Sequence, residues 1–215
     1  MSLEALPAPP ENVGKIYVSV VELAGPFFRT HGIKRGPLSP GNTGLNRFDA
    51  PDASYGVLYL GCDAHCAFVG TFAHASGTRT VTTAALKNRA LSQLKPTRPL
   101  RLIDLAGSGA LVRIGVDSRL FAGDYQRAQL WSKALHDHPA KADGLLYPSR
   151  LDPSRRAVAL FLDRHWKFAE LSRQSWYAPG PQRVLLAEIA EHYKIELIEN
   201  EFVASRKPVR QQTMF

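Results

Sequence analysis

Two arginines bracket a loop rich in glycine and proline, and their placement suggests a site for a phosphorylated ligand. Arg29 precedes and Arg47 follows residues 32–46, where Gly, Pro, Ser, Asn and Thr recur. Long loops of this composition in small proteins are often functional. Guanidinium groups bind phosphate oxygens through paired hydrogen bonds, so two of them near one loop could clamp a pyrophosphate. Surface arginines are common, however, and the spacing alone favours a solvated surface.

Metal binding and nucleophilic catalysis find less support. Cys62, His65 and Cys66 carry side chains that can bind zinc, but no second Cys or His pair follows at a suitable spacing, so we expect no metal site. Ser108 lies in a Gly-Ser-Gly turn that matches neither the G-x-S-x-G pattern of esterases nor the glycine pattern and following helix of dinucleotide-binding folds. His31 borders the glycine-rich loop and stays a candidate for ligand binding.

The elements that must position these residues are short. Short apolar runs predict strands, and apolar residues at helical spacing predict helices. We expect strands over residues 15–23, 56–61, 78–83, 100–105, 145–147, 157–162 and 195–198. We expect helices over residues 64–74, 84–94, 125–136 and 182–193, with Asp63 and Asp124 as N-caps of the first and third. Because strands and helices alternate without a regular βα order, the sequence predicts an α+β fold, a compact mixed sheet with short flanking helices.

Composition and charge narrow the class of protein. The 215 residues are 45% hydrophobic and 21% charged, which indicates one globular domain with a sizeable core. No apolar run approaches the ~18 residues of a membrane helix, and the start of the chain lacks a secretory pattern. The formal net charge of +8 attracts anions, but no basic block or nucleic-acid-binding motif occurs, so we expect no direct contact with nucleic acid. The two closely spaced cysteines do not indicate a disulfide framework, and we expect a cytoplasmic protein that contacts no membrane.

Several segments, in order along the chain, resemble the RES domain. They begin with FFRTH, which contains Arg29, and continue with GLNRFDAP at residues 44–51 and GVLYLG at residues 56–61. Further along, DL at residues 104–105, GVDSRLFAGDY at residues 115–125 and GLLYPSR at residues 144–150 fit the same pattern. The resemblance extends from about residue 27 to about residue 161, and the shared order of its motifs makes it specific.

The resemblance implies a fold, an activity and a partner. RES proteins are toxins of bacterial toxin–antitoxin pairs, are encoded beside an Xre-like antitoxin, and are similar to ADP-ribosyltransferases of the diphtheria-toxin type. Their substrate is NAD: some hydrolyse or phosphorolyse it, and others transfer ADP-ribose to a protein such as phosphoribosyl pyrophosphate synthetase. We therefore expect an NAD-consuming toxin that requires no metal and is neutralised by an Xre-like antitoxin.

The family name refers to an Arg, a Glu and a Ser, and the resemblance assigns two of these. Arg29 matches the arginine and Ser149 the serine, which is expected to hydrogen-bond the carboxamide or ribose. Tyr59 matches the family's strand tyrosine and is expected to stack on the nicotinamide. Arg47 matches a second arginine, expected to hold the pyrophosphate of NAD together with Arg29. We also place His31 in this NAD-binding group.

The family glutamate has no counterpart. Residues 67–71 read AFVGT where family members carry a pattern like A-F-x-E-T, so Gly70 occupies the catalytic position. A carboxylate there stabilises the positive charge that develops on the ribose as the nicotinamide–ribose bond breaks. Asp63 is expected as a helix cap, and Asp49 and Asp52 in a turn, so no other acid replaces it. Either the carboxylate was removed from an active toxin, or the lineage has abandoned or rebuilt the chemistry.

These observations divide the chain into three expected segments: a lead and first strand at residues 1–26, the catalytic RES domain at 27–170, and a C-terminal helix and strand packed on it at 171–215. The sequence thus predicts a toxin that cleaves NAD, impaired by the glycine at position 70. The alternative is a catalytically inactive RES domain that acts by binding its antitoxin.

Overall fold

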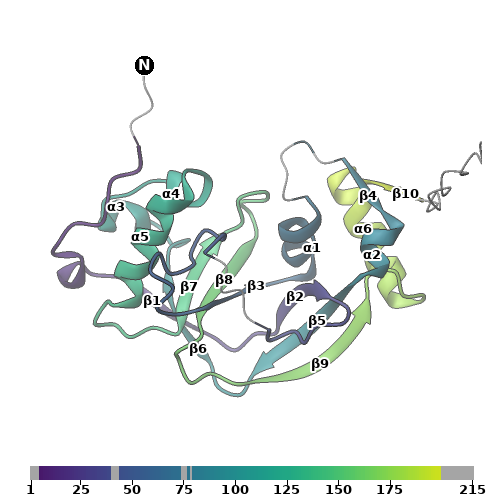
Figure 1. Cartoon of the computed structure of the whole chain (residues 1–215), viewed down its shortest axis with the longest axis horizontal. Helices are drawn as coiled ribbons and strands as arrows, with labels where there is room; N and C mark the ends of the chain where they lie inside the picture. Colours follow the sequence, from purple (N-terminus) through teal and green to yellow (C-terminus); the bar gives the residue numbers. More distant parts are fainter. Residues whose placement is uncertain (1–4, 40–43, 74–76, 78, 200–215) are drawn as a thin grey trace, which may run out of the picture.

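One mixed sheet of eight strands runs through the described part of the chain (Figure 1). The computed structural model describes residues 5–39, 44–73, 77 and 79–199. The strands follow the spatial order β1-β6-β7-β8-β3-β2-β5-β9. Strands β6 and β7 are parallel, and the other neighbouring pairs of this sheet are antiparallel. The bounds are β1 Val20–Leu23, β2 Phe27–Gly32, β3 Val57–Gly61, β5 Arg89–Pro96, β6 Leu100–Asp104, β7 Gly144–Pro148, β8 Arg156–Phe161 and β9 Phe168–Ser175.

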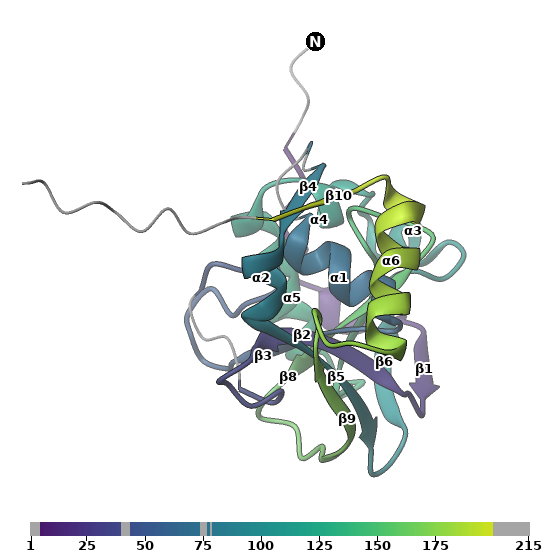
Figure 2. The ribbon, with the colours of Figure 1, turned by 90° about the vertical axis from the view of Figure 1, so that its right-hand side faces the viewer.

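Two groups of helices flank the sheet. Figure 1 shows one group, α3 Ala110–Ile114, α4 Arg119–Ala122 and α5 Tyr125–His136, on the side of β1, β6 and β7. Figure 2 looks onto the other group, α1 Ala64–Phe72, α2 Thr83–Lys87 and α6 Pro181–Tyr193. A separate parallel pair, β4 Thr80–Thr82 and β10 Glu196–Ile198, lies with this second group, and a short 3-10 helix at Val13–Lys15 precedes β1. Among the described residues, no helix has the length and apolar character needed to span a membrane.

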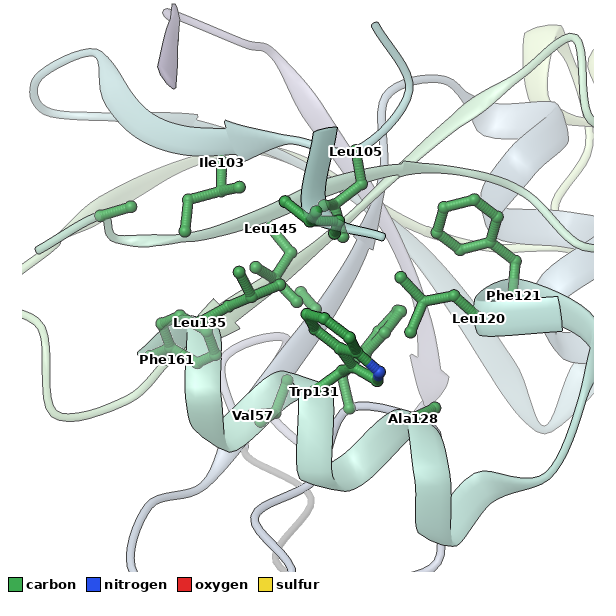
Figure 3. Close-up of a cluster of buried hydrophobic side chains, with 14 of the residues drawn as sticks. Val57, Ile103, Leu105, Leu120, Phe121, Ala128, Trp131, Leu135, Leu145 and Phe161 are labelled. Atoms are coloured by element: carbon green, nitrogen blue, oxygen red, sulfur yellow. The ribbon is translucent and has the colours of Figure 1, made fainter. Parts of the chain in front are cut away.

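Strand β3 contributes to two hydrophobic clusters, one on each face of the sheet. Val57 packs into the cluster under α5, around the buried side chain of Trp131 (Figure 3). The alternate residues Leu58 and Leu60 pack into the cluster on the opposite face. Because both faces of β3 are buried, its sequence GVLYLG reads as a continuous apolar run rather than an alternating one.

A third cluster joins α1 to the C-terminal part of the chain. Trp176, directly after β9, is fully buried and packs edge-on against Phe68 of α1, with ring centroids 5.1 Å apart. Leu186 and Ile189 of α6 complete this cluster. The boundary expected at residue 170 falls inside β9, so residues 171–199 share both the sheet and a core with the preceding described residues.

The predicted α+β fold class is confirmed, and so are most of the local elements. The strand expected over residues 56–61 is β3, and the helix expected over residues 125–136 is α5, whose N-cap Asp124 accepts hydrogen bonds from the amides of Gln126 and Arg127. The helix expected over residues 64–74 is α1, which ends at Phe72, and His74 lies outside the described residues. The predicted long loop holds no helix or strand in its described part, residues 33–39 and 44–46.

Other predicted elements are wrong. The helix expected over residues 84–94 is the short α2 followed by strand β5, whose pairing with β2 and β9 overrides the helix propensity of Ala, Leu and Lys. The strand expected over residues 15–23 begins only at Val20. A short helix, α3, does follow Gly109, whose left-handed conformation opens it. Strand β9 was not predicted because its edge position leaves polar side chains exposed.

Candidate ligand-binding site

A cavity of about 280 Å³ lies between α1, the central strands β2 and β3, and the loop that precedes β3. It brings together residues that are far apart in the sequence. Its lining includes five of the predicted site residues: Arg29, Arg47, Tyr59, Gly70 and Ser149. The volume is at the lower end of the roughly 300–1,000 Å³ found for small-molecule sites, so a dinucleotide would extend beyond it.

Arg29 projects from β2 into this cavity. Its guanidinium Nη1 donates a hydrogen bond to the carbonyl of Pro37, in the glycine-rich loop, and so ties that loop to the sheet. Burial lowers the pKa of Arg29 to about 10, because the charged form loses solvation. The side chain still carries its charge at neutral pH, in an environment where an anionic ligand would be stabilising.

Arg47 reaches the same cavity from the loop before β3. Its Nη1 donates to the carbonyl of Gly123 at 2.8 Å, and its guanidinium lies over the ring of Tyr125, 4.4 Å from the centroid. Burial lowers the pKa of Arg47, and the positive charge of the neighbouring Arg150 lowers it further. Arg150 also lines the cavity, so cationic side chains approach it from three places in the chain.

Tyr59 is held by its hydroxyl group. The hydroxyl donates to Asp49 Oδ1 at 3.0 Å and accepts from the amide of Phe48 at 2.9 Å. The other carboxylate oxygen of Asp49 accepts from both the backbone and the side-chain amide of Asn46. Burial and the Asp49 charge raise the pKa of Tyr59 well above its usual value, so the phenol stays neutral. These bonds fix the ring that lines the cavity.

Ser149 follows β7 and is buried, with 7% of its surface exposed. Its amide donates to the carbonyl of Arg155 at 2.9 Å, and both Ser149 and Cys66 of α1 line the cavity. Burial raises the pKa of the Cys66 thiol to about 12 and that of Cys62 to about 11. Both cysteines are therefore neutral thiols at physiological pH, without nucleophilic activation.

Gly70 lies on the exposed side of α1, at the edge of the cavity. A Cβ atom added to it would meet no described heavy atom within 4 Å. Asp63 is the N-cap of this helix, as predicted, and accepts from the amide of Cys66 at 2.7 Å. The described part of the chain therefore leaves room for the Cβ of a side chain at position 70.

His31 is the one predicted site residue that the structure places outside the cavity lining. It is 5% exposed, and its Nε2 is 2.8 Å from the hydroxyl of Ser92, which in turn donates to Glu170 at 2.7 Å. Burial lowers the pKa of His31. The imidazole thus lies in a hydrogen-bonded row that crosses from β2 through β5 to β9.

The cavity has a strong charge bias. It is lined by Arg29, Arg47 and Arg150, and none of the described residues that line it is Asp or Glu. No group of three or more His, Cys, Asp and Glu side chains among the described residues is arranged to hold a metal ion. The arrangement can bind an anion and stack a planar ring, and it offers no carboxylate for acid–base work.

Sequence reasoning did not assign several of the lining residues to the site. These include Asn46, Tyr125, Tyr147 and Arg150. All of them lie inside the motifs GLNRFDAP, GVDSRLFAGDY and GLLYPSR. Membership of those motifs was the available signal, since nothing in their spacing indicates that they meet.

A family model, a relative and a solved structure match this chain. The family model described as the RES domain matches residues 24–185. Over 119 residues, the chain is 31% identical to a protein of Sinorhizobium fredii (strain NBRC 101917 / NGR234) named "Probable toxin y4kH", which covers 54% of this chain and 87% of that protein. A chain of the crystal structure of the M. tuberculosis MbcT–MbcA toxin–antitoxin complex has the same fold, with a TM-score of 0.63 and 18% identity, covering 84% of this chain and 100% of that chain. The family match spans most of the described sheet and all of the cavity residues named above, and the chain belongs to the RES domain family.

Proposed function

We propose that this chain is the toxin of a bacterial toxin–antitoxin pair, acting in the cytoplasm, and that its cavity is an NAD site. Its membership of the RES family supports this, together with a relative named as a probable toxin and a structural neighbour from a toxin–antitoxin complex. The observation that carries the proposal is the cavity itself, which gathers Arg29, Arg47, Tyr59 and Ser149 from separate elements around the position of the family glutamate.

In this proposal each side chain binds a different part of NAD. Arg29 and Arg47 bind the diphosphate of NAD, because guanidinium groups make paired, charge-assisted bonds to phosphate oxygens. The ring of Tyr59, fixed through its hydroxyl, stacks on the nicotinamide. The hydroxyl of Ser149 hydrogen-bonds the carboxamide or the ribose.

In this family's chemistry the nicotinamide–ribose bond breaks and positive charge builds on the ribose. A carboxylate at position 70 would stabilise that charge and orient the nucleophile. With glycine there, the chain binds NAD but cleaves it poorly, because the lost interaction is one made mainly in the transition state. The acceptor of ADP-ribose is water, phosphate or a protein such as phosphoribosyl pyrophosphate synthetase, and the partner is an Xre-like antitoxin.

A second candidate function is supported by the same glycine. No carboxylate lines the described cavity, so the chain is also suited to act as an inactive RES domain whose role is to bind the antitoxin. The two functions differ in whether a restored carboxylate brings back turnover.

Calorimetric titration with NAD tests the proposed site. We expect Arg29→Ala to weaken NAD binding by about tenfold or more, the effect of losing one charge-assisted phosphate contact. Arg113→Ala is the matched control: Arg113 is an exposed arginine on α3 that does not line the cavity, and its loss should leave the affinity unchanged. Equal NAD affinities in the two variants would show that Arg29 does not contact NAD. If the unaltered chain did not bind NAD, the proposal would be contradicted.

A further inference from the structure

The charges around the cavity are unbalanced in a way that discriminates between dinucleotides. Arg29, Arg47 and Arg150 line it, and none of the described lining residues is acidic. Two acids hydrogen-bond to residues of the lining. Asp49 binds Tyr59 and Asn46, and Asp63 caps α1 and pairs with Arg155 at 3.0 Å. Neither of them lines the cavity.

We infer that, with glycine at position 70, this cavity prefers ligands of the ADP-ribose class that lack a cationic ring, namely ADP-ribose and NADH, over NAD⁺. The inference rests on the proposed NAD site and specifies its ligand. All three ligands share the diphosphate that the arginines bind. They differ at the other end, where NAD⁺ carries a positive nicotinamide ring, NADH a neutral one, and ADP-ribose none.

The positive ring of NAD⁺ has nothing in the described lining to compensate it. Arg29 and Arg47 are partly desolvated, so their repulsion of a nearby cation is weakly screened. Stacking on Tyr59 is open to both rings and favours the charged one, because an aromatic face attracts cations. We infer that repulsion by the arginines exceeds this attraction. A carboxylate at position 70 would offset the positive charge of the cavity. No described heavy atom lies within 4 Å of a Cβ added there.

The residue at position 70 therefore determines which ligand the cavity suits. A cavity with a carboxylate at this position would stabilise a cationic ring and the cation that follows its departure. The present cavity instead suits the product of that reaction, or the reduced dinucleotide, and the chain becomes a binder of ADP-ribose-type ligands rather than a consumer of NAD⁺.

Calorimetric titration of the full chain with ADP-ribose, NADH and NAD⁺ tests this directly. We expect ADP-ribose and NADH to bind about tenfold more tightly than NAD⁺, the effect of one unit charge in a partly screened site. The preference should shrink as salt is raised, because mobile ions screen the repulsion. Equal or tighter binding of NAD⁺ would overturn the inference and leave the NAD site standing. Failure of all three ligands to bind would overturn the proposed function and the inference with it.

Two variants of equal size separate charge from shape. Gly70→Glu and Gly70→Gln add side chains of the same length, and only the first adds a negative charge. For these variants NAD⁺ is replaced by carba-NAD, whose carbocyclic ring resists cleavage. We expect the glutamate to remove or reverse the preference and the glutamine to keep it. The same preference in both variants would show that position 70 does not face the nicotinamide end, which would also overturn the inference.

Discussion

Asp49 binds and positions two residues of the cavity lining. It lies in a turn, as predicted, but it is also 3% exposed and binds two residues that line the cavity, Tyr59 and Asn46. Its position was therefore predictable from the local sequence, whereas its partner in β3 was not. A buried carboxylate with both oxygens engaged fixes its neighbours, because leaving either oxygen unpaired carries a desolvation penalty.

Asp152 forms a second cluster, behind Ser149. Its carboxylate accepts from the hydroxyl of Tyr193 at 2.7 Å and from Nε of Arg155 at 3.0 Å, and Arg155 also pairs with the cap residue Asp63. Partial burial alone would raise the pKa of Asp152, but hydrogen bonds from Ser154 and Tyr193 and the charge of Arg155 outweigh it and lower the pKa to about 2. The cluster joins α1, α6 and the segment that carries Ser149.

Because the pKa of Asp152 is lowered in the folded state, the contribution of its carboxylate to stability depends on pH. It is present above the usual pKa of an aspartate and is lost as the pH falls from about 4 towards 2. We expect Asp152→Asn to destabilise the protein by about 1–2 kcal/mol at pH 7, in urea titrations, and by much less near pH 2. Tyr193→Phe, which removes one donor, should show a smaller difference of the same sign. If Asp152→Asn lowered the free energy of unfolding by the same amount at pH 7 and near pH 2, this explanation would be contradicted.

Among the elements, those with strong local signals were predictable and those made by long-range pairing were not. The helix α5 has an N-cap and an apolar stripe in its own sequence, and β3 is an uninterrupted apolar run. Strand β5 has neither, since its residues favour a helix and become a strand only between β2 and β9. The site follows the same rule: its residues come from β2, a loop, β3, α1 and the end of β7, and it was family resemblance rather than spacing that grouped them.

Two glycines give a matched test of how tightly the elements are packed. A Cβ on Gly144 of β7 would overlap the carbonyl oxygen of Ala159 and lie 2.9 Å from Cα of Leu160, in the adjoining β8. We expect Gly144→Ala to lower the free energy of unfolding by about 3 kcal/mol. Gly70→Ala, with open space around it among the described residues, should raise it by about 0.5–1 kcal/mol through helix propensity. Similar effects in the two variants, measured by urea unfolding, would contradict the packing described for β7.

At the scale of the whole molecule, the segment after β9 belongs to the same folding unit as the cavity. Trp176 is fully buried against Phe68 and Phe72 of α1, and its indole N–H donates to Thr30 of β2 at 3.1 Å. Both α1 and β2 line the cavity. The C-terminal segment thus holds the two elements that carry Gly70 and Arg29 in place.

Removing that tryptophan should therefore affect the whole protein. We expect Trp176→Ala to lower the free energy of unfolding by about 3–5 kcal/mol, with one cooperative transition in urea. Trp166→Ala is the control, since Trp166 is only partly buried at the edge of another cluster and should have a smaller effect. Two separate transitions, or an effect no larger than the control, would show that the C-terminal segment folds independently.

We propose that the cavity of this RES domain is an NAD-cleaving site disabled by Gly70. NAD consumption by the unaltered chain, Gly70→Glu and Gly70→Gln tests it most directly, with water, phosphate and a bacterial extract offered as acceptors. We expect turnover in the glutamate variant at a rate at least about a hundredfold above the other two, the size of effect expected from one electrostatic group in a transition state. Binding of ADP-ribose to all three proteins confirms that the site is intact. Equal rates in the glutamate and glutamine variants, or no turnover in the glutamate variant with any acceptor, would contradict the claim.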